Sequence, residues 1–282
     1  MTNDVVKLVK ETLIAAGSTF RNDKKEAYRA AIACEEDEKA RWVLQTVLEN
    51  AETAEKNRSP LCDDTGIPHL VLEIGPERAV TGTLLREIKE GVRQGLRALP
   101  GRPMGIMGDE RCRIDQSGGL NPDSAGVEPA PILLRSCEEN VLRLHILMFG
   151  GGPAIRAKTY RVFHKHSTQA VLDEIVDWAK ESVAQLGCSP CTLAVGVGRS
   201  HYEAASMMLQ AQIDGRYGIQ SDMEKEITER VNRTKIGPLG LGGSTSVLAT
   251  FMKVGPQRAS GVRIVCLRPC CCFEPRIASV EL

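Results

Sequence analysis

The sequence predicts an α/β fold in which helices pack around a small mixed β-sheet. The first sixty residues have helical periodicity, and so do residues 83–99, 169–185, 203–212 and 222–233. Short apolar runs typical of buried strands occur at 70–74, 132–134, 141–148, 192–198 and 262–267. A chain of 282 residues is long enough for a substantial core, so we expect residues 1–282 to form a single domain.

The helical N-terminal part is expected to cover about residues 1–58. A first amphipathic helix over residues 5–14 ends at Gly17, and a second covers 24–57 with a break near Cys34. Cys34 follows three alanines and is interpreted as a core residue, whereas the charged run 35–39 is interpreted as a solvated face. The later helix at 83–99 is expected to end at Pro100.

Residues 59–69 form the loop on which the functional interpretation centres. Cys62 lies between a proline and Gly66 and is followed directly by Asp63 and Asp64. A long helix precedes this loop and a buried strand follows it, so packed elements hold Cys62 on both sides. Loops on a rigid scaffold concentrate binding residues. The alternative is a small apolar cysteine that fills a turn.

Three further loops have compositions suited to binding. Residues 101–131 are rich in glycine, proline and aspartate and contain Arg111 and Arg113, which could bind a carboxylate substrate or simply lie in a solvated loop. Three consecutive glycines at 150–152 could cradle an anion with their N–H groups or form a flexible turn. Residues 236–246 form a second glycine-rich loop that ends in three hydroxyl residues.

Composition excludes several classes of function. Lysine plus arginine and aspartate plus glutamate both number 36, so no net charge favours nucleic acid or an anionic membrane. No apolar run reaches the roughly 18 residues of a membrane span, and residues 1–4 lack the pattern of a signal peptide. We therefore expect a cytoplasmic protein whose ten cysteines stay reduced.

Reduced cysteines are available as metal ligands. Cys188 and Cys191 form one CxxC pair, which alone is a weak signal for zinc. Cysteine occurs together with proline or glycine in the loops around Cys62, Cys188 and residues 270–272, and an iron–sulfur cluster can be held by such distant loops.

Four motifs in order resemble one enzyme family. They are Cys62-Asp63-Asp64-Thr65-Gly66, the glycines 150–152, Cys188-Ser189-Pro190 with the trailing Val195-Gly196-Val197-Gly198, and Gly237-Pro238-Leu239-Gly240-Leu241-Gly242-Gly243-Ser244-Thr245. Together they resemble the motifs of the alpha-type subunit of the class I fumarase and L(+)-tartrate dehydratase family of iron–sulfur hydro-lyases.

The resemblance implies a [4Fe–4S] cluster held by three cysteine loops that converge on one edge of the fold. The ligands would be Cys62, Cys188 and one cysteine of the triplet at 270–272. Cys272 fits the family's cysteine–aromatic frame best because Phe273 follows it, while Cys271 and Cys270 stay open and Cys266 fits less well.

The resemblance also implies the reaction and a partner. The expected activity is the reversible dehydration of a small hydroxy acid, such as malate to fumarate or tartrate to oxaloacetate, with the open iron as Lewis acid. Asp64 would be catalytic, and Asp63, Asp64, Gly151 and Gly152 would contact substrate. The general base would come from a separate beta-type subunit in a hetero-oligomer. The alternative is a non-catalytic relative that binds a cluster or zinc.

Overall fold

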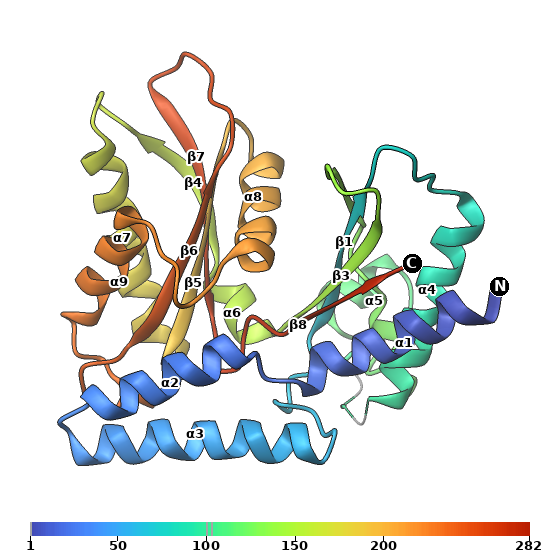
Figure 1. Cartoon of the computed structure of the whole chain (residues 1–282), viewed down its shortest axis with the longest axis horizontal. Helices are drawn as coiled ribbons and strands as arrows, with labels where there is room; N and C mark the ends of the chain where they lie inside the picture. Colours follow the sequence, from blue (N-terminus) through green and yellow to red (C-terminus); the bar gives the residue numbers. More distant parts are fainter. Residues whose placement is uncertain (1, 100, 103) are drawn as a thin grey trace. The chain divides into compact units, whose positions relative to one another are not determined.

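The computed structural model describes residues 2–99, 101–102 and 104–282, which divide into two compact units. Unit 1 comprises the chain up to Phe20 with Ala51–Gly150 and Arg276–Leu282, and unit 2 comprises Arg21–Asn50 and Gly151–Pro275. Each unit contains helices and a four-stranded mixed sheet among its described residues (Figure 1). The predicted α/β class is confirmed, with two small sheets where the sequence analysis expected one. A single domain over residues 1–282 stays a prediction.

The helical N-terminal part is confirmed. Helices α1 (Thr2–Ser18), α2 (Asn22–Cys34) and α3 (Glu38–Lys56) follow one another, and the expected break near Cys34 separates α2 from α3. The interpretation of Cys34 as a core residue was wrong, because Cys34 is exposed. The solvated face is confirmed for residues 36–39, which are exposed, but not for Glu35, whose side chain is buried. The buried residues of helix α2 are Lys24 and Tyr28, which lie on one face of the helix.

The sheet of unit 1 has the strand order β2-β1-β3-β8. Strand β1 (Ile67–Ile74) pairs in parallel with β2 (Leu133–Ser136) and antiparallel with β3 (Leu142–Phe149), which pairs antiparallel with β8 (Ile277–Glu281). The last strand of the chain therefore completes a sheet that begins more than 200 residues earlier.

Helices α1 and α4 (Gly82–Ala98) pack against each other over the core of this sheet. The two helices approach closely because α4 has glycines at the contact: a Cβ atom on Gly91 would lie 2.6 Å from Cβ of Val9. Thr81 caps α4 by accepting a hydrogen bond from the amide of Leu84 at 3.2 Å. Pro100, which the sequence analysis expects to end this helix, lies outside the described residues.

The sheet of unit 2 has the strand order β4-β7-β5-β6. Strand β7 (Val262–Cys270) pairs antiparallel with β4 (Lys158–Phe163) and with β5 (Cys191–Gly198), and β5 pairs in parallel with β6 (Val247–Val254). Because β5 and β7 are antiparallel, the start of β5 and the end of β7 lie at the same end of the sheet, with Thr192 opposite Cys270.

Helices cover both faces of this sheet (Figure 1). Helices α7 (Thr168–Leu186) and α9 (Asp222–Asn232) form the core of one face with Leu193, Val195 and Val197. Helix α8 (His201–Asp214) packs on the other face, where a Cβ atom on Gly196 would lie 2.0 Å from the carbonyl oxygen of Ala204. Every residue of β5 is buried, which is typical of a strand covered on both faces.

Several elements were not predicted. Strands β4, β6 and β8 are additions, and the loop after β3 contains the short helix α6 (Gly151–Arg156). The expected loop at 101–131 contains α5 (Glu110–Asp115) and the 3-10 turn η1 (Ser124–Val127), and the second glycine-rich loop contains the 3-10 turn η2 (Pro238–Gly240). Across the part of the chain that the structure describes, no helix has both the length and the apolar composition to cross a membrane.

We predict that Gly196→Ala destabilises the protein by about 1–3 kcal/mol or more, because the new methyl group would overlap the backbone of α8, which cannot rotate away. The measurement is the midpoint of urea unfolding followed by circular dichroism. Gly218→Ala is the matched control, since a Cβ atom there would meet nothing within 4 Å. Equal midpoints for the two variants would contradict the close approach of β5 and α8.

Candidate functional site

The loop that carries Cys62 connects α3 to β1, as predicted, and lies in unit 1. The amide of Leu61 donates to the carbonyl oxygen of Gly17 at 3.0 Å, and the Leu61 side chain is buried. Nη1 of Arg276, itself buried, donates to the carbonyl oxygen of Asp64 at 2.8 Å. The loop is therefore anchored to α1 and to the segment that enters β8.

Two tight contacts restrict the backbone after Cys62. Gly66 has φ +87°, and a Cβ atom there would lie 2.7 Å from the carbonyl group of Phe149, so only glycine fits. The buried side chain of Thr65 leaves no room for a Cβ atom on Gly101. The backbone is fixed while the Cys62 side chain stays partly accessible.

The two carboxylates after Cys62 have different surroundings. The Asp63 side chain is 80% exposed and forms an ion pair of 3.0 Å with Nη1 of Arg102. Asp64 is partly buried, and its backbone carbonyl is the acceptor for Arg276. Asp64 is therefore the more restrained of the two.

The triple glycine does not form the expected open loop. Strand β3 ends at Phe149, and Gly151 and Gly152 are the first residues of α6. A Cβ atom on Gly152 would meet nothing within 4 Å, and Nη1 of Arg156 donates to the Gly152 carbonyl oxygen at 3.0 Å. Packing within the chain thus gives no reason for glycine at position 152.

Arg111 and Arg113, which the sequence analysis considered for carboxylate binding, lie on α5 and are exposed. Asp109 caps this helix by accepting a hydrogen bond from the amide of Cys112 at 3.0 Å. The arginines therefore belong to a short surface helix in unit 1.

In unit 2, the Cys188 loop lies between α7 and β5 and is bonded to the second glycine-rich loop. Oγ of Ser189 donates to the carbonyl oxygen of Gly237 at 2.6 Å, and the amide of Leu239 donates to the carbonyl oxygen of Ser189 at 3.0 Å. Gly237 has φ +73°, and a Cβ atom on it would lie 1.6 Å from the carbonyl oxygen of Gly242. The Cys188 motif and the glycine-rich motif, which are separate in the sequence, are thus held together by hydrogen bonds.

The third cysteine motif meets the same loop. The amide of Cys272 donates to the carbonyl oxygen of Cys188 at 2.8 Å, and a turn follows in which the amide of Glu274 donates to the carbonyl oxygen of Cys271 at 2.9 Å. A hydrogen bond with the Cys271 side chain and burial raise the pKa of the Cys272 thiol, and the nearby Cys188 thiol adds to this shift.

The three neighbouring cysteines are not equivalent. Cys270 is the last residue of β7, is fully buried, and its thiol donates to Oε1 of Gln212 at 3.4 Å. Cys272 is the one whose backbone amide bonds directly to the Cys188 loop. These contacts favour Cys272 over Cys270 as the partner of Cys188.

Two side chains of α2 hold the turn after Cys272. The hydroxyl of Tyr28 donates to the carbonyl oxygen of Cys272 at 3.0 Å, and Nζ of Lys24 donates to the carbonyl oxygen of Glu274. Lys24 and Tyr28 are both completely buried. Burial lowers the pKa of Lys24 to about 8, against the opposing effect of the nearby cysteines and Glu274.

A buried ion pair lies in the same turn. Nη2 of Arg268 is 3.1 Å and 3.2 Å from the two carboxylate oxygens of Glu274, and both side chains are almost fully buried. This ion pair joins Arg268 of β7 to Glu274 of the turn that follows the strand.

Glu35 supports the second glycine-rich loop. One of its carboxylate oxygens accepts hydrogen bonds of 2.8 Å from both the amide and the hydroxyl of Ser244. Burial raises the pKa of Glu35, but the bonds from Ser244 outweigh that effect and hold the pKa below its ordinary value. No sequence pattern indicates the roles of Glu35, Lys24 or Tyr28, because each lies in a charged segment that resembles a solvated helix face.

The ten cysteines, all of them among the described residues, form no disulfide bond. Among residues 2–99, 101–102 and 104–282, no three histidine, cysteine, aspartate or glutamate side chains form a group that could hold a metal ion. Unit 2 brings Cys188 and Cys272 together, while Cys62 belongs to unit 1.

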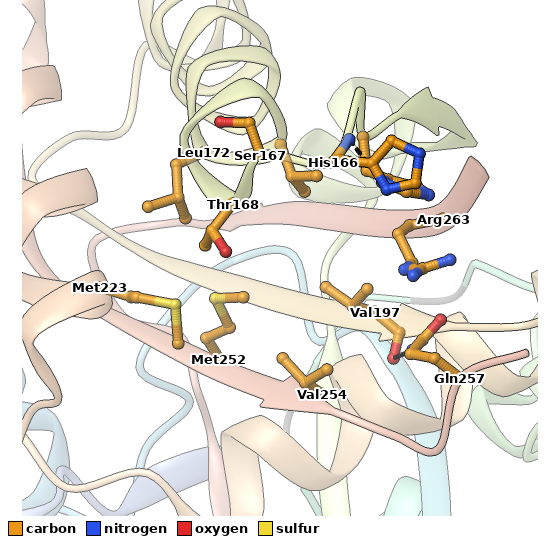
Figure 2. Close-up of a pocket in the computed structure, with 12 residues that line it drawn as sticks. His166, Ser167, Thr168, Leu172, Val197, Met223, Met252, Val254, Gln257 and Arg263 are labelled. Carbon is orange, nitrogen blue, oxygen red and sulfur yellow. Dashed lines mark hydrogen bonds between the residues drawn. The ribbon is translucent and has the colours of Figure 1, made fainter. Parts of the chain in front are cut away.

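Unit 2 also has an apolar cavity of about 360 Å³ (Figure 2). Met223, Met252 and Leu172 line one side, and His166, Arg263 and Gln257 lie on the other. Val197 lies near the end of β5 and Arg263 near the start of β7, so roughly 20 Å of extended strand separates the cavity from the cysteine motifs. The cavity is therefore distinct from the cysteine site.

Comparison with known proteins identifies the family. The family described as fumarate hydratase (Fumerase) matches residues 6–281. A Methanocaldococcus jannaschii protein, provisionally named L(+)-tartrate dehydratase subunit alpha, is 27% identical over 97% of this chain and 94% of its own length. The L(+)-tartrate dehydratase subunit alpha of Escherichia coli (strain K12) is 21% identical over 81% of this chain and 75% of its own length.

A longer relative comes from Geobacillus stearothermophilus and is provisionally named fumarate hydratase class I. It is 24% identical over 82% of this chain, and the match covers 46% of that protein. Since the family match extends over nearly the whole sequence, the chain belongs to the fumarate hydratase (Fumerase) family of hydro-lyases.

Proposed function

We propose that the chain is the alpha-type subunit of an iron–sulfur hydro-lyase that dehydrates a small hydroxy acid, such as malate or tartrate. The hydrogen bond of 2.8 Å between the Cys272 amide and the Cys188 carbonyl carries the proposal, because it joins two cysteine motifs that are 84 positions apart in the sequence. The relatives named as tartrate dehydratase alpha subunits support the type of subunit.

The residues present fit an iron–sulfur cluster by their chemistry. Cys188 and Cys272 are reduced thiols on neighbouring backbone segments, and thiolate is the ligand that such clusters require. Cys62 would be the third ligand. Its assignment comes from the Cys-Asp-Asp-Thr-Gly motif, and its partial exposure and fixed backbone suit a ligand.

If Cys62, Cys188 and Cys272 held a cluster, one iron would lack a protein ligand and would supply Lewis-acid chemistry toward a hydroxyl leaving group. The protein must then supply substrate orientation and proton transfer. Asp64 is our candidate for orienting the substrate or the catalytic group, because it is two residues from Cys62 and its backbone carbonyl is held by Arg276. Its carboxylate can accept a hydrogen bond from a substrate hydroxyl group.

Substrate carboxylates need donors and a site without strong repulsion. Asp63 would repel them, but its ion pair with Arg102 offsets that charge, and the guanidinium can donate to a carboxylate. Gly151 and Gly152 would contribute N–H groups, since position 152 has room for a ligand where a side chain would stand. We propose that the base that removes the carbon-bound proton belongs to a beta-type partner subunit.

We predict that Asp64→Asn lowers kcat by about 10²-fold, the order of loss when the position of a substrate is disturbed, without loss of iron. The measurement is turnover of the complex with its beta-type partner, together with its iron content. Asp177→Asn is the control, because that side chain is 71% exposed and forms only a surface ion pair. Unchanged kcat in Asp64→Asn would remove Asp64 from the proposed catalytic site.

We predict that Cys62→Ser, Cys188→Ser and Cys272→Ser each reduce the iron content from about four atoms per chain to near zero, since serine is a poor replacement for a soft thiolate. Iron and acid-labile sulfide are measured after anaerobic purification. Cys34→Ser is the control, as Cys34 is exposed on α2. If Cys272→Ser keeps a full cluster while Cys271→Ser or Cys270→Ser loses it, the third ligand is Cys271 or Cys270 instead. Zinc without sulfide in the unmodified protein would favour the non-catalytic alternative.

We predict that the chain alone has no measurable turnover with malate or tartrate and gains it when purified with a beta-type subunit, because the proposed general base is on that subunit. A spectrophotometric assay of fumarate or oxaloacetate formation measures this, with the same cluster content in both samples. Equal turnover by the isolated chain would place the base on this chain instead.

A further inference from the structure

We propose that Lys24 and Tyr28 form a clamp on the third cysteine motif, and that the ammonium group of Lys24 stabilises the negative charge of the cluster-bearing site. This inference rests on the proposed function. It adds two positioning residues, from a helix that carries none of the four motifs.

The geometry of the clamp is specific. Lys24 and Tyr28 are four residues apart on α2 and therefore lie on one face of the helix, which is the face that α2 buries. Their polar ends bond to two carbonyl oxygens of the same turn, those of Glu274 and Cys272. A helix that is largely exposed elsewhere thus fixes the backbone on both sides of Phe273.

The choice of lysine needs an electrostatic reason. Burying an ammonium group is strongly unfavourable unless other charges compensate it, and an apolar side chain could have filled this position. Glu274 and the three neighbouring cysteines all oppose the lowering of the Lys24 pKa, so the ammonium group lies close to both Glu274 and the cysteine turn. The adjacent cysteines are neutral as thiols but anionic as cluster ligands, and three thiolates give a bound cluster a net negative charge.

The sign of the effect on the cluster follows from Coulomb's law. Reduction adds one more negative charge, so a buried cation beside the cysteines favours the reduced form and raises the reduction potential. It also slows the loss of the cluster, because each thiolate is more stable beside a positive charge. Tyr28 has no charge, so its contribution is the position of the Cys272 backbone.

The experiment separates charge from position with three variants of the full chain. Lys24→Gln removes the charge but keeps an N–H donor, Lys24→Arg keeps the charge, and Tyr28→Phe removes only the hydroxyl group. The control is Lys39→Met, an exposed lysine on α3. Each anaerobically reconstituted protein is titrated electrochemically with detection by electron paramagnetic resonance, and cluster loss to an iron chelator is timed.

We expect Lys24→Gln to have a more negative midpoint potential and to lose its cluster about 10- to 100-fold faster, the usual range for groups that support metal ligands. Lys24→Arg should keep the original potential, Tyr28→Phe should lose the cluster faster at an unchanged potential, and Lys39→Met should match the unmodified protein. Circular dichroism of the metal-free variants checks their folding, and Lys24→Met replaces Lys24→Gln if the latter does not fold.

An unchanged potential and rate of cluster loss in a folded Lys24→Gln would overturn the inference and leave the proposed function intact. Equal shifts of the potential in Lys24→Gln and Tyr28→Phe would overturn the role of the charge. If the unmodified protein assembles no cluster from iron and sulfide, the proposed function is wrong and the inference is overturned with it.

Discussion

The antiparallel pairing of β5 and β7 brings two of the cysteine motifs of unit 2 to one end of its sheet. Its register places Thr192 opposite Cys270, so the loop before β5 and the turn after β7 must lie at the same end of the sheet. The hydrogen bond between Cys272 and Cys188 is the direct result. A shift of the register by one residue would turn the side chains of β7 to the opposite face and displace the turn that carries Cys272.

The second glycine-rich loop, residues 236–246, is hydrogen-bonded to the Cys188 loop at the same end of the sheet. It bonds to Ser189 through two backbone groups and to Glu35 through Ser244. Residues from α2, the Cys188 loop, the glycine-rich loop and the end of β7 thus support one another. The residues that line the apolar cavity, among them Met223 and Met252, lie at the other end of the sheet and include none of these supporting residues.

Local sequence pattern was sufficient to predict some helices and strands of this fold but not others. The periodicity of residues 5–14 and 169–185 and the small-residue run at 192–198 predicted α1, α7 and β5, because burial there follows the helix or strand period. Strand β4 is mostly exposed at a sheet edge and β8 is five residues long, so long-range pairing rather than local pattern creates both. The sequence motifs located the cysteine loops, but burial of Lys24 depends on which face of α2 meets the cysteine turn, and no local rule contains that information.

The position of β8 has a consequence for the biosynthesis of the protein. Strand β3 can pair with β1 as soon as residue 149 has left the ribosome, but its other edge stays open until residues 277–281 have been made. At ordinary rates of translation this interval is on the order of ten seconds. Arg276, which holds the Asp64 backbone, lies in the same segment as β8. Unit 1 therefore becomes complete only after translation has passed through residues 151–275, and the Cys62 loop gains its contact with Arg276 only then.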